Sequence, residues 1–151
     1  MISMENRIQK LKEHIHQADA VIIGAGAGLS TAAMRIPTEL LPTCPNCGRP
    51  LTMNLRSDDK FVEDKGWQEA AVEYEAWLTA HQHQKVVYLE IGVGYNTPVI
   101  IKYPFWQQVY QNKNVTYACL NMEEAPVPEE IRDRSIVISG DSAQVIQELV
   151  S

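Results

Sequence analysis

The sequence predicts an α/β protein in which helices cover both faces of a parallel β-sheet. Four short, largely apolar segments at 20–23, 86–91, 115–120 and 135–139 have the length and composition of buried parallel strands. Segments with helical periodicity mostly alternate with them, which is the chain order of a parallel sheet with helical crossovers. A chain of 151 residues is long enough to form one domain of this kind.

Apolar side chains at helical spacing predict the helices. Ile8, Leu11 and Ile15 recur on one face of residues 4–18, and residues 29–34 would open a second helix after a glycine-rich turn. A wider, aromatic face predicts a further helix over 66–82. The members of this face are Trp67, Ala70, Ala71, Tyr74, Trp77, Leu78 and His81.

Capping residues predict where two more helices begin. Thr97 and Pro98 are typical of the N-cap and the first position of a helix. Pro104 must then break or restart this helix, because proline cannot donate to the preceding turn. Asp141 is a favourable N-cap for a last helix over 142–150.

The composition excludes several classes of function. The net charge of −6 gives no electrostatic support for binding nucleic acid. No apolar stretch approaches the roughly 20 residues that span a bilayer, and the polar, helical first residues do not resemble a signal peptide. Three cysteines, two of them in a CxxC motif, suit a reducing compartment. We therefore expect a cytoplasmic protein that binds neither nucleic acid nor membranes.

The stretch VIIGAGAGLS at 21–30 predicts a strand, a glycine-rich turn and the start of a helix. Such a turn lets the backbone approach a phosphate, and the free amides of the helix N-terminus point at the anion. The alternating Gly24, Gly26 and Gly28 depart from the usual G-x-G-x-x-G spacing, so a tight connection without a ligand is the alternative. Ser30 suits either a phosphate contact or a helix cap.

Cysteines in a proline-rich stretch point to a metal. Four prolines and a CPNCG turn predict a small irregular module at 37–59. Cys44 and Cys47 form a zinc-knuckle turn that supplies two of the four ligands of a structural zinc. Cys119 falls within a predicted buried strand and is expected in the core. The sequence thus predicts half of a zinc site.

In chain order, these motifs resemble those of the sirtuins, a family of NAD-dependent protein deacylases and ADP-ribosyltransferases. GAGAGLSTAA resembles the sirtuin nucleotide loop, and CPNCG followed by LTMNLR resembles the second half of the zinc module. YLEIGVGYNTPVIIKYPFWQ is similar to the strand and loop on the nicotinamide-ribose side of NAD. YACLNMEE and ISGD resemble the segments at the adenosine end. The motifs look most similar to those of the bacterial macrodomain-linked sirtuins, which resemble protein ADP-ribosyltransferases more than deacylases.

The resemblance implies a Rossmann-like fold and a set of NAD-binding residues. The glycine loop would line the pyrophosphate, the segment after 86–91 would lie near the phosphate or the nicotinamide-side ribose, and the ends of the last two strands would hold the adenosine. The implied residues are Gly24, Ala25, Gly26, Ala27, Gly28, Ser30, Gly92, Val93, Gly94, Thr97, Asn121, Met122, Asp141 and Ser142. For Asn121, Asp141 and Ser142, turn or cap chemistry is the alternative. Glu90 is expected to be a buried structural carboxylate.

One departure from the family pattern has structural consequences. Ala33 is followed almost at once by sequence that resembles the approach to the second CxxC, as after an internal deletion. The deleted part would contain the catalytic residues, and we assign none in this chain. A sheet ordered 3-2-1-4-5-6 would be reduced to the order 1-4-5-6, with strand 1 at a new edge. We expect one truncated domain over 1–151 with a zinc-ribbon-like remnant at 36–60.

The sequence leaves three functions open. The first is a sirtuin-like domain that binds NAD or ADP-ribose weakly and does not catalyse, because the cofactor loop and catalytic segment are absent. The second is an NAD-dependent protein ADP-ribosyltransferase or deacylase that a partner chain completes. The third is a structural homodimer with a vestigial nucleotide site that binds a protein partner. In a homodimer, the Cys44 and Cys47 turns of two copies would together supply a four-thiolate zinc site.

Overall fold

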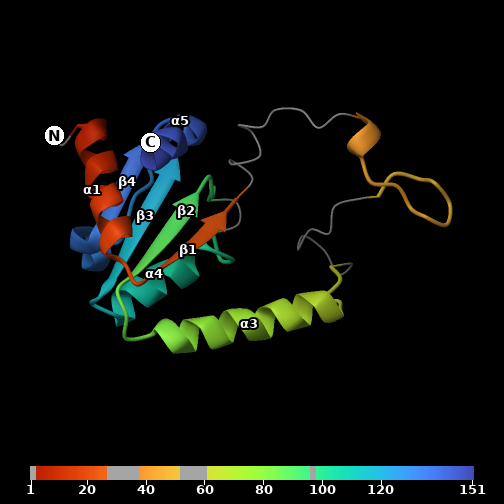
Figure 1. Cartoon of the computed structure of the whole chain (residues 1–151), viewed down its shortest axis with the longest axis horizontal. Coiled ribbons are helices and arrows are strands. Elements are labelled where there is room, and N and C mark those ends of the chain that lie inside the picture. The colour runs from red at the N-terminus through yellow and green to blue at the C-terminus, as the bar shows by residue number, and fades with distance from the viewer. Residues whose placement is uncertain (1–2, 27–37, 52–60, 96–97) are drawn as a thin grey trace. The chain divides into compact units, whose positions relative to one another are not determined.

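A computed structural model describes residues 3–26, 38–51, 61–95 and 98–151 (Figure 1). The chain divides into two compact units, one formed by Met1–Ala33 with His81–Ser151 and the other by Met34–Ala80. The helix expected at 29–34 lies outside the described residues, as do four of the predicted binding residues: Ala27, Gly28, Ser30 and Thr97.

The larger unit contains a four-stranded sheet in which every neighbouring pair is parallel. The strands are β1 (Ala20–Ala25), β2 (Val86–Ile91), β3 (Val115–Asn121) and β4 (Ser135–Ser139). They lie side by side in chain order, which is the predicted order 1-4-5-6 with β1 at one edge. The predicted fold class is therefore confirmed.

Two helices, α1 (Met4–Gln17) and α5 (Ser142–Val150), pack together on one face of this sheet (Figure 1). Asp141 caps α5 as predicted, because its carboxylate accepts the amide N–H of Ala143 at 2.8 Å. A cluster of buried apolar side chains lies between these helices and the sheet. It consists of Ile8, Leu11, Val87, Leu89, Ile91, Ala118, Leu120, Ile136, Ile138 and Val145.

The opposite face of the sheet is covered by α4 (Lys102–Gln111), and its core is aromatic. The ring of Phe105 meets that of Tyr88 edge-on, with 4.9 Å between the centroids. Trp106 meets Tyr117 in the same way at 6.4 Å. Helices thus cover both faces, as the alternation of strands and helices predicts.

The start of α4 corrects one prediction. The helix begins at Lys102 and not at Thr97, so that Pro104 is the third helical residue. The N–H groups of a first helical turn have no acceptor within the helix, so a proline there removes no hydrogen bond. A proline further into a helix would remove a backbone hydrogen bond. For this reason a single regular helix cannot run from Thr97 through Pro104.

The burial of β1 corrects a second prediction. Composition predicts a fully buried strand, yet Val21 is 36% exposed and Ile23 is 61% exposed. Their partners in register on β2, Val87 and Leu89, are buried. The difference arises because β1 is an edge of the described sheet and α1 packs mainly along β4.

The smaller unit contains η1 (Thr38–Leu40) and most of the long helix α3 (Lys65–His81). The helix confirms the aromatic periodicity of 66–82, and Asp64 accepts the amide N–H of Trp67 at 2.8 Å at its start. None of the residues in this helix is buried. No helix in the described part of the chain is both long and apolar enough to cross a membrane.

Replacing Leu11 with alanine is expected to lower the free energy of unfolding by about 2–5 kcal/mol, because its side chain is 0% exposed and would leave a cavity in the core. Urea denaturation followed by circular dichroism measures the change. Val150→Ala is the control, since Val150 is 80% exposed and should change the free energy by less than about 0.5 kcal/mol. Equal effects of the two substitutions would contradict this description of the core.

Candidate functional site at the carboxyl edge of the sheet

The predicted binding segments that the structure describes lie at one edge of the sheet, where the parallel strands end. Gly24 and Ala25 close β1, and residues 92–94 follow β2. Asn121 closes β3, and Asp141 stands between β4 and α5. Strands of one direction end at one edge, and open parallel sheets bind their ligands there. The four segments therefore have the placement that a shared site requires.

Packing requires two of the alternating glycines, one near the end of β1 and one directly after it. A Cβ added at Gly26 would lie 2.6 Å from the carbonyl oxygen of Gly92. A Cβ added at Gly24 would lie 2.5 Å from Cγ2 of Ile101 and 2.9 Å from Cζ of Phe105. Side chains at either position would overlap their neighbours in a closely packed interior. The alternating spacing thus has a cause within the fold, which is close contact with the connection after β2 and with α4.

The connection after β2 contains two glycines of different character. Gly92 has a φ of 62°, in the left-handed region that favours glycine, and its amide N–H donates to the carbonyl of Leu120 at 2.9 Å. Gly94 is exposed, and a Cβ added there would meet no atom of the described residues within 4 Å. The fold therefore requires glycine at the first position and leaves open space at the second.

Two side-chain hydrogen bonds join this connection to the segment after β3. The Asn121 amide donates to the carbonyl of Val93 at 3.3 Å and accepts the N–H of Met122 at 2.9 Å. The Tyr95 hydroxyl, which no sequence motif marks as a site residue, donates to the carbonyl of Pro126 at 3.1 Å. The turn chemistry considered for Asn121 is thus present. Its two hydrogen bonds leave the Asn121 side chain one further amide N–H and one further carbonyl lone pair.

At the end of β4, cap chemistry is also present. The carboxylate of Asp141 is the N-cap of α5, and Ser142 is buried at the first position of this helix.

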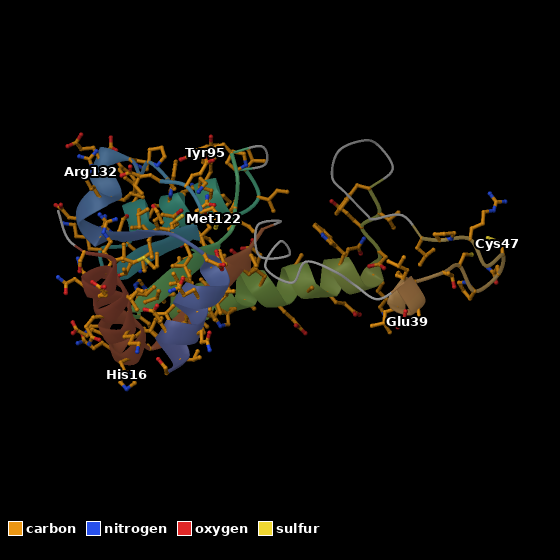
Figure 2. The ribbon with its side chains drawn as sticks, turned by 90° about the horizontal axis from the view of Figure 1, so that it is seen from above. His16, Glu39, Cys47, Tyr95, Met122 and Arg132 are labelled. Carbon is orange, nitrogen blue, oxygen red and sulfur yellow. The ribbon has the colours of Figure 1, made fainter. Side chains whose placement is uncertain are left out.

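Met122, the first residue after β3, is exposed. Figure 2 labels Met122 and also Tyr95, whose hydroxyl donates to the carbonyl of Pro126 in the same segment after β3.

A buried polar cluster lies beside the connection after β2. Glu90 is 0% exposed, which confirms the expected buried carboxylate. It accepts hydrogen bonds from the hydroxyl of Tyr117 at 2.7 Å and from the thiol of Cys119 at 3.5 Å. Lys102 forms an ion pair with it and is also 0% exposed. Lys102 gives no signal in the sequence, because lysine is almost always a surface residue and its partner is 12 positions away.

This cluster keeps its neutral donors protonated. Burial and then the charge of Glu90 raise the pKa of the Cys119 thiol to about 12. Burial is also the main cause that raises the pKa of the Tyr117 hydroxyl, followed by Cys119 and Glu90. Cys119 is buried within β3, which confirms the prediction that it belongs to the core.

The CxxC turn lies in the smaller unit. The N–H of Gly48 donates to the carbonyl of Cys44 at 2.8 Å, and Gly48 has a φ of 69°. The backbone N–H groups of Asn46 and Cys47 lower the pKa of the Cys44 thiol. Among the described residues, no three His, Cys, Asp or Glu side chains gather to hold a metal ion. The turn offers two thiol ligands, and zinc stays a prediction.

Two known proteins are similar to this chain, whereas no protein-family model matches it. A "Protein ADP-ribosyltransferase" of Staphylococcus aureus strain Mu50 is 38% identical over 114 residues, which cover 75% of this chain and 36% of that protein. A "Probable bifunctional ADP-ribose hydrolase/ADP-ribosyltransferase" of Fusarium oxysporum f. sp. cubense is 30% identical over 112 residues, which cover 70% and 19%. The chain is related to ADP-ribosyltransferases. It spans about a third of the first relative and about a fifth of the second.

Thiol reactivity should separate the three cysteines. Thiolates are the reactive species, so at near-neutral pH, with EDTA present to keep zinc off the thiols, the disulfide reagent DTNB is expected to react quickly with Cys44, whose pKa is lowered, and with the exposed Cys47. Cys119, buried and protonated, should react only after unfolding in guanidinium. Cys119→Ala is the control and should leave the fast phase unchanged. Three fast thiols in the folded protein would contradict the burial of Cys119.

Proposed function

We propose that the chain is a sirtuin-like domain that binds the ADP-ribose part of NAD at the carboxyl edge of its sheet. The observation that carries the proposal is the placement of four segments, each resembling a sirtuin nucleotide segment, at one edge of a parallel sheet. This edge is where open α/β sheets bind ligands. The names of both relatives refer to the transfer of an ADP-ribosyl group, which supports the same class of ligand for this chain.

The described residues would divide the ligand between them. No described residue occupies the space where a side chain at Gly94 would lie, so the main chain there is accessible to a phosphate or to the nicotinamide-side ribose. Asn121 keeps one N–H and one lone pair for a ribose hydroxyl beside its two internal bonds. Met122 is exposed and apolar, which suits contact with adenine.

We propose further that this chain binds the ligand weakly and does not catalyse by itself. The support is that none of its residues matches the catalytic position of the family it resembles. A second candidate is an NAD-dependent protein ADP-ribosyltransferase or deacylase whose remaining parts come from a partner chain. The first relative, of which this chain spans 36%, favours that candidate.

ADP-ribose is expected to raise the melting temperature, because a ligand that binds only the folded state stabilises it, by about 2.7 kcal/mol at one hundred times its Kd. Gly94→Val should abolish this shift without lowering the melting temperature of the free protein, since the new side chain enters open space. Gly66→Val is the matched control. A Cβ there meets its nearest atom at an ordinary 3.5 Å, and the shift should persist.

Three results would count against parts of the proposal. The absence of any shift with ADP-ribose or NAD would contradict the binding site. A calorimetric Kd in the micromolar range or below would contradict weak binding. Release of nicotinamide from NAD by the purified chain would contradict the lack of catalysis and favour the second candidate.

We propose that a second copy of the chain is its partner. The outer side of β1 has no partner strand among the described residues, and β1 carries no charged side chain that would oppose pairing. The turn of Cys44 and Cys47 supplies half of a tetrahedral zinc site, which two copies would complete. This arrangement also describes the third function, a structural homodimer.

Light scattering and metal analysis test the shared zinc site. The expected result is a dimer with about one zinc per two chains, since four thiolates hold one structural zinc. Cys44→Ser should abolish zinc binding, whereas Cys119→Ala should retain it because that thiol is buried in β3. A monomer that holds about one zinc per chain, or a protein without zinc, would be inconsistent with sharing.

A further inference from the structure

The ion pair of Glu90 and Lys102 is an unusual component of a core. Moving two charges out of water is costly, and an apolar pair of similar size is often at least as stable. Both side chains are 0% exposed here, so neither keeps contact with solvent. The stability of the fold therefore gives little reason for this pair, and its position suggests another role.

The pair joins the two ends of one connection. Glu90 is in β2, two residues before Gly92, and Lys102 is the first residue of α4. The chain between them leaves the carboxyl edge of the sheet and returns to it. An attraction between its two ends therefore fixes where this connection starts and where it stops.

The carboxylate is itself held in place by β3. One oxygen of Glu90 accepts the hydroxyl of Tyr117 at 2.7 Å, and the other accepts the thiol of Cys119 and the ammonium of Lys102. A buried carboxylate with protein donors on both oxygens has few alternative positions. The Glu90 carboxylate thus fixes the position of the Lys102 ammonium beside the connection after β2.

The same ammonium contacts a ring of the connection. Its nitrogen lies 5.1 Å from the ring centroid of Tyr95, within the range of a cation–π interaction. The Tyr95 hydroxyl in turn donates to the carbonyl of Pro126. A continuous series of contacts therefore runs from Glu90 in the core, through Lys102 and Tyr95, to the segment after β3.

We propose that Lys102 is a positioning residue, whose buried ammonium holds the Tyr95 ring and thereby fixes residues 92–95 in the conformation that receives the ribose–diphosphate part of the ligand. The ligand part of this inference rests on the proposed function, and the ordering of the connection does not. Adenosine would bind at the ends of β3 and β4, so AMP should depend on Lys102 much less than ADP-ribose does.

The double substitution Glu90→Gln with Lys102→Met tests the proposal. It removes both charges together, and glutamine keeps a carbonyl oxygen for Tyr117. We expect hydrogen exchange of residues 92–95 to accelerate, and the affinity for ADP-ribose to fall about tenfold while that for AMP stays unchanged. The melting temperature should stay close to that of the wild type.

Two further variants complete the test. Tyr95→Leu removes the ring at an exposed position without disturbing the buried charges, so it should reproduce the faster exchange even if the double variant fails to fold. Tyr117→Phe is the control, because it removes one hydrogen bond to Glu90 and leaves the contact of Lys102 with Tyr95 in place. It should show wild-type exchange in residues 92–95.

The outcomes distinguish this inference from the proposed function. Unchanged exchange of residues 92–95 in folded Tyr95→Leu would overturn the positioning role. Faster exchange throughout β2 and β3, with ADP-ribose and AMP weakened equally, would overturn it as well and assign the pair to the fold. Faster exchange confined to residues 92–95, in a protein that binds neither ligand, would support the positioning role and overturn the proposed function.

Discussion

The parallel pairing of neighbouring strands up to their last residues determines the form of the candidate site. At three of the four strand ends, the residue that follows the strand is a glycine whose amide N–H donates to a carbonyl near the end of a neighbouring strand. These bonds run from Gly26 to Ile91, from Gly92 to Leu120 and from Gly140 to Asn121, at 2.8, 2.9 and 2.9 Å. The connections therefore leave the sheet in register with one another. The contacts among these connections depend on the fact that the connections begin at the same level of the sheet.

The two faces of the sheet have different chemistry. The face under α1 and α5 carries the cluster of buried apolar side chains, and burial of apolar area is the main source of stabilisation. The face under α4 combines aromatic rings with an ion pair between Glu90 and Lys102. The polar face adjoins the connection that follows β2. The stability of the domain and the geometry of its candidate site are thus provided by separate layers.

Local sequence signals were sufficient for most of the fold. The periodicity of α1 and α3 and the bounds of β2 and β4 follow from hydrophobic pattern alone, and the start of α5 follows from its Asp141 cap. The helix start predicted at Thr97 was wrong, whereas the restart predicted at Pro104 agrees with a helix that begins at Lys102. Two prolines, Pro98 and Pro104, both fit a first helical turn, and a local pattern does not choose between them. Exposure of β1 could not be predicted from its composition, since the burial of a strand depends on what lies beside it.

The candidate site could be predicted in its segments and only partly in its contacts. Gly92 and Asn121 were named because their segments resemble those of a known family, and the structure places Gly92 directly after β2 and Asn121 at the end of β3. Tyr95 and Lys102 were missed because their roles depend on partners that the fold brings close, namely Pro126 and Glu90. Long polar side chains give no local signal of burial.

The alternation of glycines after β1 has a consequence for how such motifs are interpreted. Gly24 makes room for α4, and Gly26 makes room for the connection after β2. Each glycine is therefore required by a neighbour inside the protein. A sheet of this construction would keep both glycines after losing its cofactor, and a pseudoenzyme would carry the same fingerprint as an active relative. At Gly94 a Cβ would meet no described residue within 4 Å, so in the proposed site only the ligand would require a glycine there. We therefore expect that, among homologues, replacement of Gly94 marks the loss of the proposed nucleotide binding better than a change in the glycine motif does.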